Sequence, residues 1–348
     1  MKILIAGGCG FLGSNIAADR LKRGDEVFII DALFRVGAES NKAWLEDGSS
    51  QGKLVISVFD IAENDKLEQF FKENGPFDAI AHLAGQVAMT TSMSDPRRDF
   101  LTNVVGTFNV LEATRLYSPE AIFVYSSTNK VYGELNSLRY EETTTRYVTP
   151  DYPNGFAEDL PLDFSSPYGC SKGSADQYVR DWHRNFGLNT IVFRHSSIYG
   201  GRQFSSFDQG WVGWFCLQAL KQRQALDSGK EVETFTIAGN GKQVRDVLYA
   251  QDLINLYNSA FECGKYCAGR IFNIGGGIEN TLSLLELFNL LEEILDIQLN
   301  YRQLPPRHSD QKLFVADIQL AQEQLLWIPS VSASEGIRRQ LEWVSKNL

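Results

Sequence analysis

The sequence predicts an α/β protein: a doubly wound parallel sheet followed by a smaller C-terminal α/β lobe. Short apolar runs alternate with helical patterns over the first 195 residues, and a glycine-rich turn follows the first run. The chain has 348 residues, which is long for a single core. We expect residues 1–195, with 244–262 returning to them, to form the larger domain, and residues 196–348 to form mainly the smaller lobe.

Composition narrows the class of protein. The net charge of -10 should repel nucleic acid and anionic membrane surfaces. No apolar run approaches the roughly 20 residues that span a bilayer, and the N-terminus lacks the apolar core of a signal peptide, so we expect a cytoplasmic protein. Five cysteines indicate reduced thiols. Cys263 and Cys267 have no second ligand pair nearby, so no metal is predicted.

The N-terminal segment predicts the first strand–helix–strand unit. Residues 2–6 are apolar without alternation, as in a buried parallel strand. Residues 11–21 repeat apolar side chains at helical spacing, and Gly24 ends this helix. Residues 27–30 predict a second buried strand, which ends at Asp31. Three glycines therefore lie between a strand and a helix: Gly7, Gly10 and Gly13.

These glycines have the spacing of a phosphate-binding turn. Gly7 permits the tight turn, Gly10 lets the backbone approach a pyrophosphate, and Gly13 lets the helix pack on the strand. The helix N-terminus offers free N–H groups to phosphates. Asp31 can accept hydrogen bonds from ribose hydroxyls and would repel a 2′-phosphate, which favours NAD over NADP, although an arginine placed like Arg35 can serve NADP. A purely structural glycine turn is the alternative.

The alternation continues along the chain. Residues 54–59, 79–83 and 121–125 predict further strands, and residues 97–117 predict a helix with an apolar side. Strands that alternate with helices in this way indicate a parallel, Rossmann-type sheet.

A possible catalytic group follows the strand at 121–125. That strand runs into a hydroxyl-rich segment that contains Thr128. Tyr168 and Lys172 are four residues apart and share one helix face. An ammonium beside a phenol should lower the pKa of Tyr168, so that it acts as a base near neutral pH. Taken alone, the pair could be an ordinary surface pair.

With these motifs the chain resembles, over nearly its whole length, the extended short-chain dehydrogenase/reductases, which include NAD-dependent nucleotide-sugar epimerases and dehydratases. The resemblance implies that Thr128 and Tyr168 are catalytic and that Lys172 binds ribose and tunes Tyr168. The cofactor-binding residues that it implies are Gly7, Gly10, Phe11, Leu12, Gly13, Asp31, Asp60, Ile61, Leu83, Ala84, Gly85, Asn103, Tyr168 and Lys172.

The resemblance also implies a nucleotide-sugar site in the C-terminal lobe. Arg245 and Arg307 lie in segments that resemble those whose arginines contact the sugar's diphosphate, and an arginine fork suits a diphosphate. Arg202 has an equal chance of being a solvated surface group, and the family often has Asn near Ser197. The implied substrate-binding residues are Gln86, Thr128, Asn129, Lys130, Ser197, Arg202, Arg245 and Arg307.

Two positions bear on the reaction. Dehydratases of the family carry an Asp–Glu pair after the catalytic Thr, but this chain has Asn129 and Lys130, which argues against dehydration. Longer stretches (84–92, 126–133, 153–155, 193–197 and 208–215) resemble a narrower group, the epimerases that interconvert CDP-paratose and CDP-tyvelose at C2.

A ketone at C4 would acidify C3 and C5 but not C2. Inversion at C2 is therefore simplest by transient oxidation at C2 itself, with Tyr168 taking the hydroxyl proton and NAD the hydride. An epimerase acting at another carbon of a different nucleotide sugar stays open as an alternative. So does a non-catalytic nucleotide-sugar-binding protein.

Three features remain open at this stage. Residues 134–166 are polar and irregular, and could form a loop over the sugar or a surface excursion. Helices at 209–224 and 283–294 are expected in the smaller lobe. In the family, helices like those at 97–117 and 168–185 commonly form a subunit contact, so a homodimer or homotetramer is expected. The resemblance also suggests bacterial surface-polysaccharide synthesis.

Overall fold

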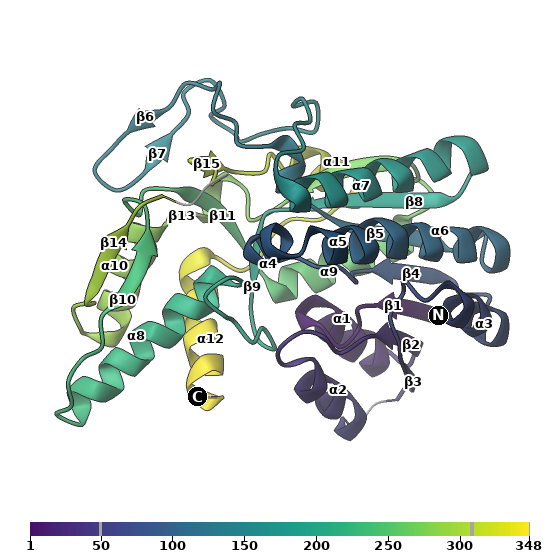
Figure 1. Cartoon of the computed structure of the whole chain (residues 1–348), viewed down its shortest axis with the longest axis horizontal. Helices are drawn as coiled ribbons and strands as arrows, with labels where there is room; N and C mark the ends of the chain where they lie inside the picture. Colours follow the sequence, from purple (N-terminus) through teal and green to yellow (C-terminus); the bar gives the residue numbers. More distant parts are fainter. Residues whose placement is uncertain (49–50, 307–309, 348) are drawn as a thin grey trace.

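A seven-stranded sheet forms the centre of the protein in the computed structural model, which describes residues 1–48, 51–306 and 310–347 (Figure 1). All neighbouring strands are parallel, in the order β12-β8-β5-β4-β1-β2-β3. The doubly wound parallel sheet predicted from the sequence is confirmed. Its strands are β1 (Lys2–Ala6), β2 (Glu26–Asp31), β3 (Lys53–Val58), β4 (Ala79–His82), β5 (Ile122–Thr128), β8 (Asn189–His195) and β12 (Arg270–Ile274).

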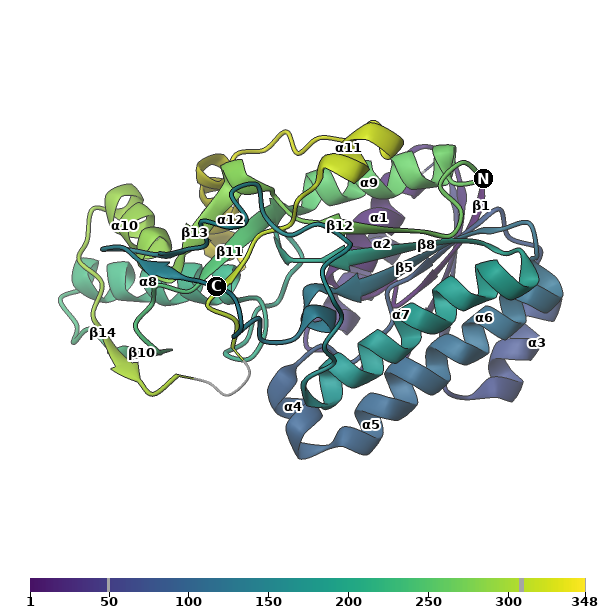
Figure 2. The same ribbon diagram turned by 90° about the horizontal axis from the view of Figure 1, so that it is seen from above.

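Helices cover both faces of this sheet (Figure 2). One face carries α1 (Phe11–Lys22), α2 (Ala38–Asp47), α9 (Ala250–Cys263) and α11 (Gln319–Leu325). The other carries α3 (Asn64–Asn74), α4 (Met89–Ser94), α5 (Pro96–Phe100), α6 (Gly106–Tyr117) and α7 (Ser166–Phe186). Successive side chains of a strand point to opposite faces, so Ile3 and Ile5 enter one buried core and Leu4 enters the other.

The helix predicted at residues 97–117 is interrupted. A π-helical turn, η1 (Leu101–Val105), separates α5 from α6 without breaking the helical path. π-Helical turns are rare and often accompany functional sites. Here the turn contains Asn103, whose side-chain amide donates hydrogen bonds to Gln86 and Ser171.

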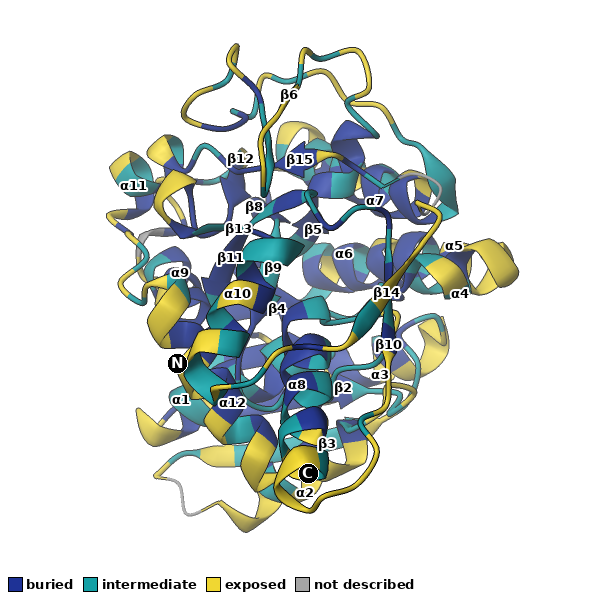
Figure 3. Cartoon of the chain, turned by 90° about the vertical axis from the view of Figure 1, so that its left-hand side faces the viewer, coloured by how far each residue is buried: buried dark blue, intermediate teal, exposed yellow. Residues whose placement is uncertain are grey.

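A second group of elements packs around its own apolar core, which includes Phe215, Leu287 and Ile337. Figure 3 shows α8 and α12 with one buried and one exposed side. The helices are α8 (Trp211–Asp227), α10 (Leu284–Leu295) and α12 (Ala333–Lys346), and the short turn is η3 (Ile278–Asn280); another short turn, η2 (Asn129–Tyr132), follows β5 and packs on α7 beside the large sheet. The strands are β9 (Ser197–Tyr199), β10 (Phe235–Ala238), β11 (Val244–Tyr249), β13 (Thr281–Ser283), β14 (Tyr301–Leu304) and β15 (Leu313–Phe314).

The chain crosses between the two groups of elements more than once. Helix α9 packs on α1, and β12 joins the large sheet from a part of the sequence that the predicted division assigned to the smaller lobe. The division of the chain into two units stays a proposal.

The segment from 134 to 165 contains a short hairpin, β6 (Glu141–Glu142) and β7 (Tyr147–Val148). This hairpin lies beside β13 and β11 in Figure 1. Lys242 donates to Glu142 at 2.7 Å, and Arg146 pairs with Glu286 of α10. The segment is therefore fastened to the second group of elements.

Within the part of the chain that the structure describes, no helix combines the length and the apolar character needed to cross a membrane.

Candidate active site

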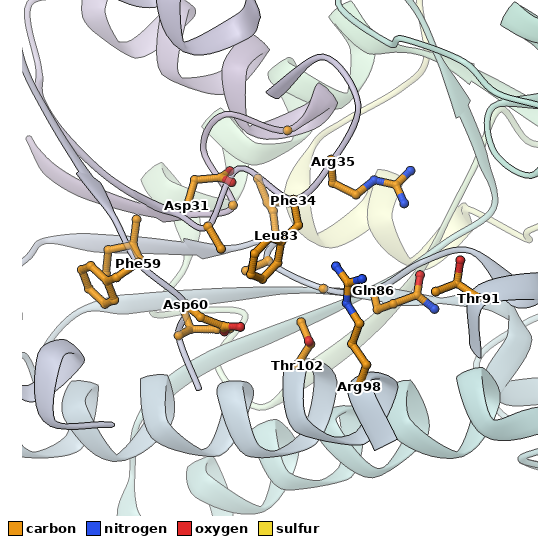
Figure 4. A pocket seen from close by; sticks show the side chains of 17 residues that line it. Asp31, Phe34, Arg35, Phe59, Asp60, Leu83, Gln86, Thr91, Arg98 and Thr102 are labelled. Carbon is orange, nitrogen blue, oxygen red and sulfur yellow. The ribbon is translucent and has the colours of Figure 1, made fainter. Parts of the chain in front are cut away.

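A cavity of about 240 Å³ opens where β1, β2, β3 and β4 end (Figure 4). The carboxyl ends of parallel strands, at the point where the strand order reverses, are where open α/β sheets bind ligands. Eight of the predicted cofactor residues line this cavity: Gly7, Gly10, Asp31, Asp60, Ile61, Leu83, Ala84 and Gly85.

The glycine turn is held too tightly for side chains. Gly7 has φ +85°, and a Cβ there would lie 2.6 Å from the backbone nitrogen of Ala84. A Cβ on Gly13 would lie 2.2 Å from the carbonyl oxygen of Gly7. Phe11, Leu12 and Gly13 form the first turn of α1, whose amides have no partner within a helix. The first amides of α1 can therefore donate to a ligand placed beside Gly10, which lines the cavity.

Asp31 is fixed at the end of β2 by two backbone bonds. Its Oδ2 accepts from the Cys9 amide at 2.9 Å, and its Oδ1 accepts from the Leu33 amide at 2.8 Å. Burial raises the pKa of this carboxyl, and the backbone donors oppose that rise. On the far side, Asp60 Oδ1 accepts from the Ala62 amide at 2.9 Å. The bare turn and the anchored carboxylates fit the phosphates, ribose and adenine of NAD.

Three predicted catalytic side chains meet beside this cavity. Thr128 ends β5, while Tyr168 and Lys172 lie on the first turns of α7, and all three are buried. The Thr128 hydroxyl lies near the phenol of Tyr168 and favours its ionised form. Lys172 donates from Nζ to the Ser126 carbonyl oxygen at 2.5 Å. Helix α7 packs on β5, so the strand end and the helix together position the group.

The expected lowering of the Tyr168 pKa is wrong for this arrangement. Burial raises it to about 12, and the Thr128 hydroxyl only partly opposes that rise. Lys172 is itself buried, which lowers its pKa to about 7 against the opposing charges of Asp176 and Asp99. Desolvation therefore outweighs the ammonium–phenol effect that the Tyr-x-x-x-Lys spacing suggested.

Asn103 and Gln86 belong to a buried polar network next to Lys172. Asn103 accepts from the Gln86 amide at 2.9 Å and donates to Ser171 at 2.9 Å. The Gln86 side chain donates to Asp99 at 2.9 Å, and Ser171 donates to the other oxygen of Asp99. Because the Gln86 amide group is used inside the protein, the structure gives its predicted contact with substrate no direct support.

Asn129, Lys130 and Arg245 gather at the end of β5. Asn129 donates to Gln311 at 3.0 Å, and Arg245 pairs with Asp310 at 2.8 Å. Burial, and then the charge of Arg245, lower the pKa of Lys130 to about 8. Two cationic side chains thus lie close together just beyond Thr128.

The other predicted substrate residues are spread more widely. Ser197 accepts from the Trp211 indole at 3.1 Å. Arg202 stacks 4.0 Å from the ring centre of Trp44 on α2, away from Arg245. Arg307 lies outside the described residues.

The cavity also has lining residues that the sequence analysis did not select: Phe34, Phe59, Thr91, Arg98 and Thr102. Arg98 follows Asp95-Pro96, an N-terminal helix signal, but nothing in the sequence connects α5 to a cavity formed by β1 and β2. Among residues 1–48, 51–306 and 310–347, no group of three or more metal-ligating side chains could hold a metal ion.

Comparison with known proteins identifies the family. The model described as GDP-mannose 4,6 dehydratase matches residues 4–340. The chain belongs to this family of the extended short-chain dehydrogenase/reductases. CDP-paratose 2-epimerase of Salmonella typhi is 51% identical over 345 residues, covering 99% of each chain.

Two solved family members share the whole architecture. UDP-glucose 4-epimerase of Thermotoga maritima, solved with UDP-glucose, superposes with a TM-score of 0.80 at 29% identity, covering 100% of this chain and 99% of its own. UDP-glucuronic acid 4-epimerase of Bacillus cereus, solved with UDP-glucuronic acid and NAD, gives 0.79 at 26% identity, covering 100% of both. These findings confirm the predicted family, fold class and enzyme class, an NAD-dependent nucleotide-sugar epimerase.

Proposed function

We propose that the protein is an NAD-dependent 2-epimerase that interconverts CDP-paratose and CDP-tyvelose. The observation that carries this proposal is the 51% identity to CDP-paratose 2-epimerase over 99% of the chain. The site agrees with it. Asn129 and Lys130 follow Thr128. The site therefore has no carboxylic acid at the two positions where the dehydratases of the family carry an Asp–Glu pair.

The residues at the end of β5 and on α7 suit proton transfer at a sugar hydroxyl. Bound NAD supplies a reversible hydride acceptor. Tyr168 acts as the base in its phenolate form and takes the proton of the C2 hydroxyl, and the Thr128 hydroxyl favours that form against the rise in pKa that burial causes. The C2–H bond breaks as the ketone forms. The 2-keto sugar then presents its other face, the hydride returns to C2, and Tyr168 returns the proton to oxygen. The sugar is neither oxidised nor reduced overall.

The cationic end of the site suits the nucleotide diphosphate. Lys130 and Arg245 lie close enough for the charge of Arg245 to lower the pKa of Lys130. A bound diphosphate would relieve that repulsion with its negative charges. Lys130 therefore binds the substrate together with Arg245. In the dehydratases of the family, an acidic residue occupies the position of Lys130.

A single incubation tests the reaction. Purified protein is mixed with CDP-paratose in D₂O, with and without added NAD, and the sugar is followed by NMR. CDP-tyvelose that keeps protium at C2 supports transient oxidation at C2. Deuterium at C2 would mean exchange with solvent and would overturn the hydride route. No new sugar would reject this substrate and favour another nucleotide sugar or a binding protein.

The self-association surface is part of the same proposal. Helices α6 and α7 expose the aromatic side chains of Phe108, Tyr178 and Phe186; Phe108 contacts Tyr178, and Phe186 contacts Trp182. An apolar exposed helix pair of this kind fits a second copy of the chain. A homodimer would form a four-helix contact there, and sedimentation of Phe108→Glu against the unchanged protein tests it.

A further inference from the structure

Two arginines from separate elements meet at the cofactor cavity. Arg35 lies in the loop after β2, and Arg98 lies on α5. Both line the cavity, and Figure 4 shows both on the side of Gln86 and Thr91, away from Asp31. The glycine turn, by contrast, contributes only backbone groups.

The two guanidinium groups repel each other. Both side chains are exposed at the mouth of the cavity, and partial desolvation there and then the charge of Arg98 lower the pKa of Arg35. The ion pairs among the described residues include neither arginine. Arg98 instead stacks on Phe34, with its guanidinium carbon 5.0 Å from the ring centre. Two unpaired like charges at one cavity wall form a local site of positive potential.

The neighbouring carboxylates do not neutralise this potential by contact. Asp31 accepts from the Cys9 and Leu33 amides, and Asp60 accepts from the Ala62 amide. Both carboxylates line the same cavity but are oriented by backbone donors. An anionic group of a ligand is the natural counter-charge for the arginines.

We propose that Arg35 and Arg98 clasp the pyrophosphate of the dinucleotide from the side opposite the glycine turn. This inference rests on the proposed use of NAD. A guanidinium fork can give a phosphate two parallel hydrogen bonds and adds a full positive charge, whereas backbone amides are uncharged donors. The 2′-position of the adenosine ribose is a second possible source of a phosphate. The carboxylate of Asp31 makes it the less favourable one.

The clasp is also connected to the catalytic helix. Arg98 and Asp99 are adjacent on α5, and Asp99 accepts a hydrogen bond from Ser171 of α7. Ser171 precedes Lys172. A phosphate that binds Arg98 would therefore help to fix the position of the segment of α7 that carries Lys172.

Calorimetric titration of the full chain with NAD and with NADP tests the clasp. The variants are Arg35→Gln, Arg98→Gln and the double variant, and the matched control is Arg97→Gln, the exposed neighbour that does not line the cavity. We expect each single substitution to weaken NAD binding about 10- to 100-fold, as for loss of a hydrogen bond to a charged group, with the control unchanged. NADP binding should weaken by the same factor.

The affinities of the arginine variants for the two dinucleotides test the proposal. An equal loss of affinity for NAD and NADP supports the pyrophosphate clasp. A loss of affinity for NADP alone would assign the arginines to the 2′-phosphate and overturn the clasp. Unchanged binding of both would overturn it as well. A wild-type chain that binds neither dinucleotide would reject the proposed use of NAD, which is a different failure.

Thermal unfolding separates this effect from misfolding. Removing one of two repelling charges should leave the melting temperature without ligand unchanged or raise it. The rise in melting temperature on adding NAD should shrink, because that rise depends on affinity. A variant that melts lower without ligand but keeps the full NAD-induced rise would show a structural role only and would contradict the clasp.

Discussion

Lys172 donates a hydrogen bond from Nζ to the carbonyl oxygen of Ser126 at 2.5 Å, although Tyr168 precedes it by one turn on the same helix. The same ammonium lies 4.3 Å over the ring of Tyr125. Lys172 is thus directed at strand β5, and the side chain that favours the ionised form of Tyr168 is Thr128. Control of the Tyr168 proton therefore depends on Thr128 and on burial.

Replacing Tyr168 by Phe should abolish most turnover while leaving the fold intact. The substitution removes only the hydroxyl that takes the substrate proton, so we expect a loss of about 100- to 10,000-fold in kcat. Turnover is measured by NMR with CDP-paratose, and NAD affinity by calorimetry. Tyr266→Phe is the matched control because Tyr266 is 94% exposed. Full activity of Tyr168→Phe would remove Tyr168 from the mechanism.

Replacing Arg245 by Gln should weaken binding of the nucleotide sugar and leave binding of the cofactor unchanged. Arg245 pairs with Asp310 and lies near Lys130, away from the cavity that the glycine turn forms. We expect KM to rise about 10- to 100-fold, with kcat and NAD affinity little changed. Arg338→Gln, at an exposed position on α12, is the control. An unchanged KM would place the diphosphate elsewhere.

The sequence predicted those parts of the site that follow from local spacing. The glycine turn, Asp31, Thr128, Tyr168 and Lys172 each occur at the end of a strand or at the start of a helix. Because parallel strands end at the same edge, the topology brings these residues together.

Other features depend on burial and on contacts between distant segments, which no local pattern records. The pKa of Tyr168 rises because the phenol is desolvated. Arg98 lines the cavity only because the fold brings α5 next to the ends of strands β1 and β2, and β12 joins the sheet from far along the chain. Gln86 has an unusual sequence context, but the structure uses its amide to hold Asp99.

Replacing Arg146 by Ala should release the hairpin of β6 and β7 from α10. The guanidinium donates to Glu286 at 2.7 Å through Nε and to Thr281 at 3.0 Å. The hairpin also holds Lys242, three residues before Arg245. We expect a KM several-fold higher with kcat little changed, measured with CDP-paratose. A rate defect with unchanged KM would instead give the hairpin a role in the chemical step.

Replacing Asp176 by Asn should destabilise the whole protein. Asp176 and Arg194 are 0% and 2% exposed, and they pair at 2.9 Å. Removing one charge leaves the other buried without a partner, which lowers the free energy of unfolding by about 3–5 kcal/mol. Urea denaturation measures this loss. The control is Asp227→Asn, which breaks the exposed pair with Arg223 and should cost about 0–1 kcal/mol. Equal losses in the two variants would contradict the prediction.

His195 should make the protein less stable in acid. Burial lowers its pKa to about 3, and the charge of Lys172 adds to this effect. The unfolded chain binds this proton near pH 6.5, so the stabilisation is fully present above that pH. It is lost as the pH falls from about 6.5 towards 3, at up to about 1.4 kcal/mol per pH unit. His195→Gln should flatten the dependence of the unfolding free energy on pH between about 6 and 4, since Gln does not titrate. Urea denaturation across this range measures the slope, and parallel curves for the two proteins would mean that His195 is protonated in the folded state.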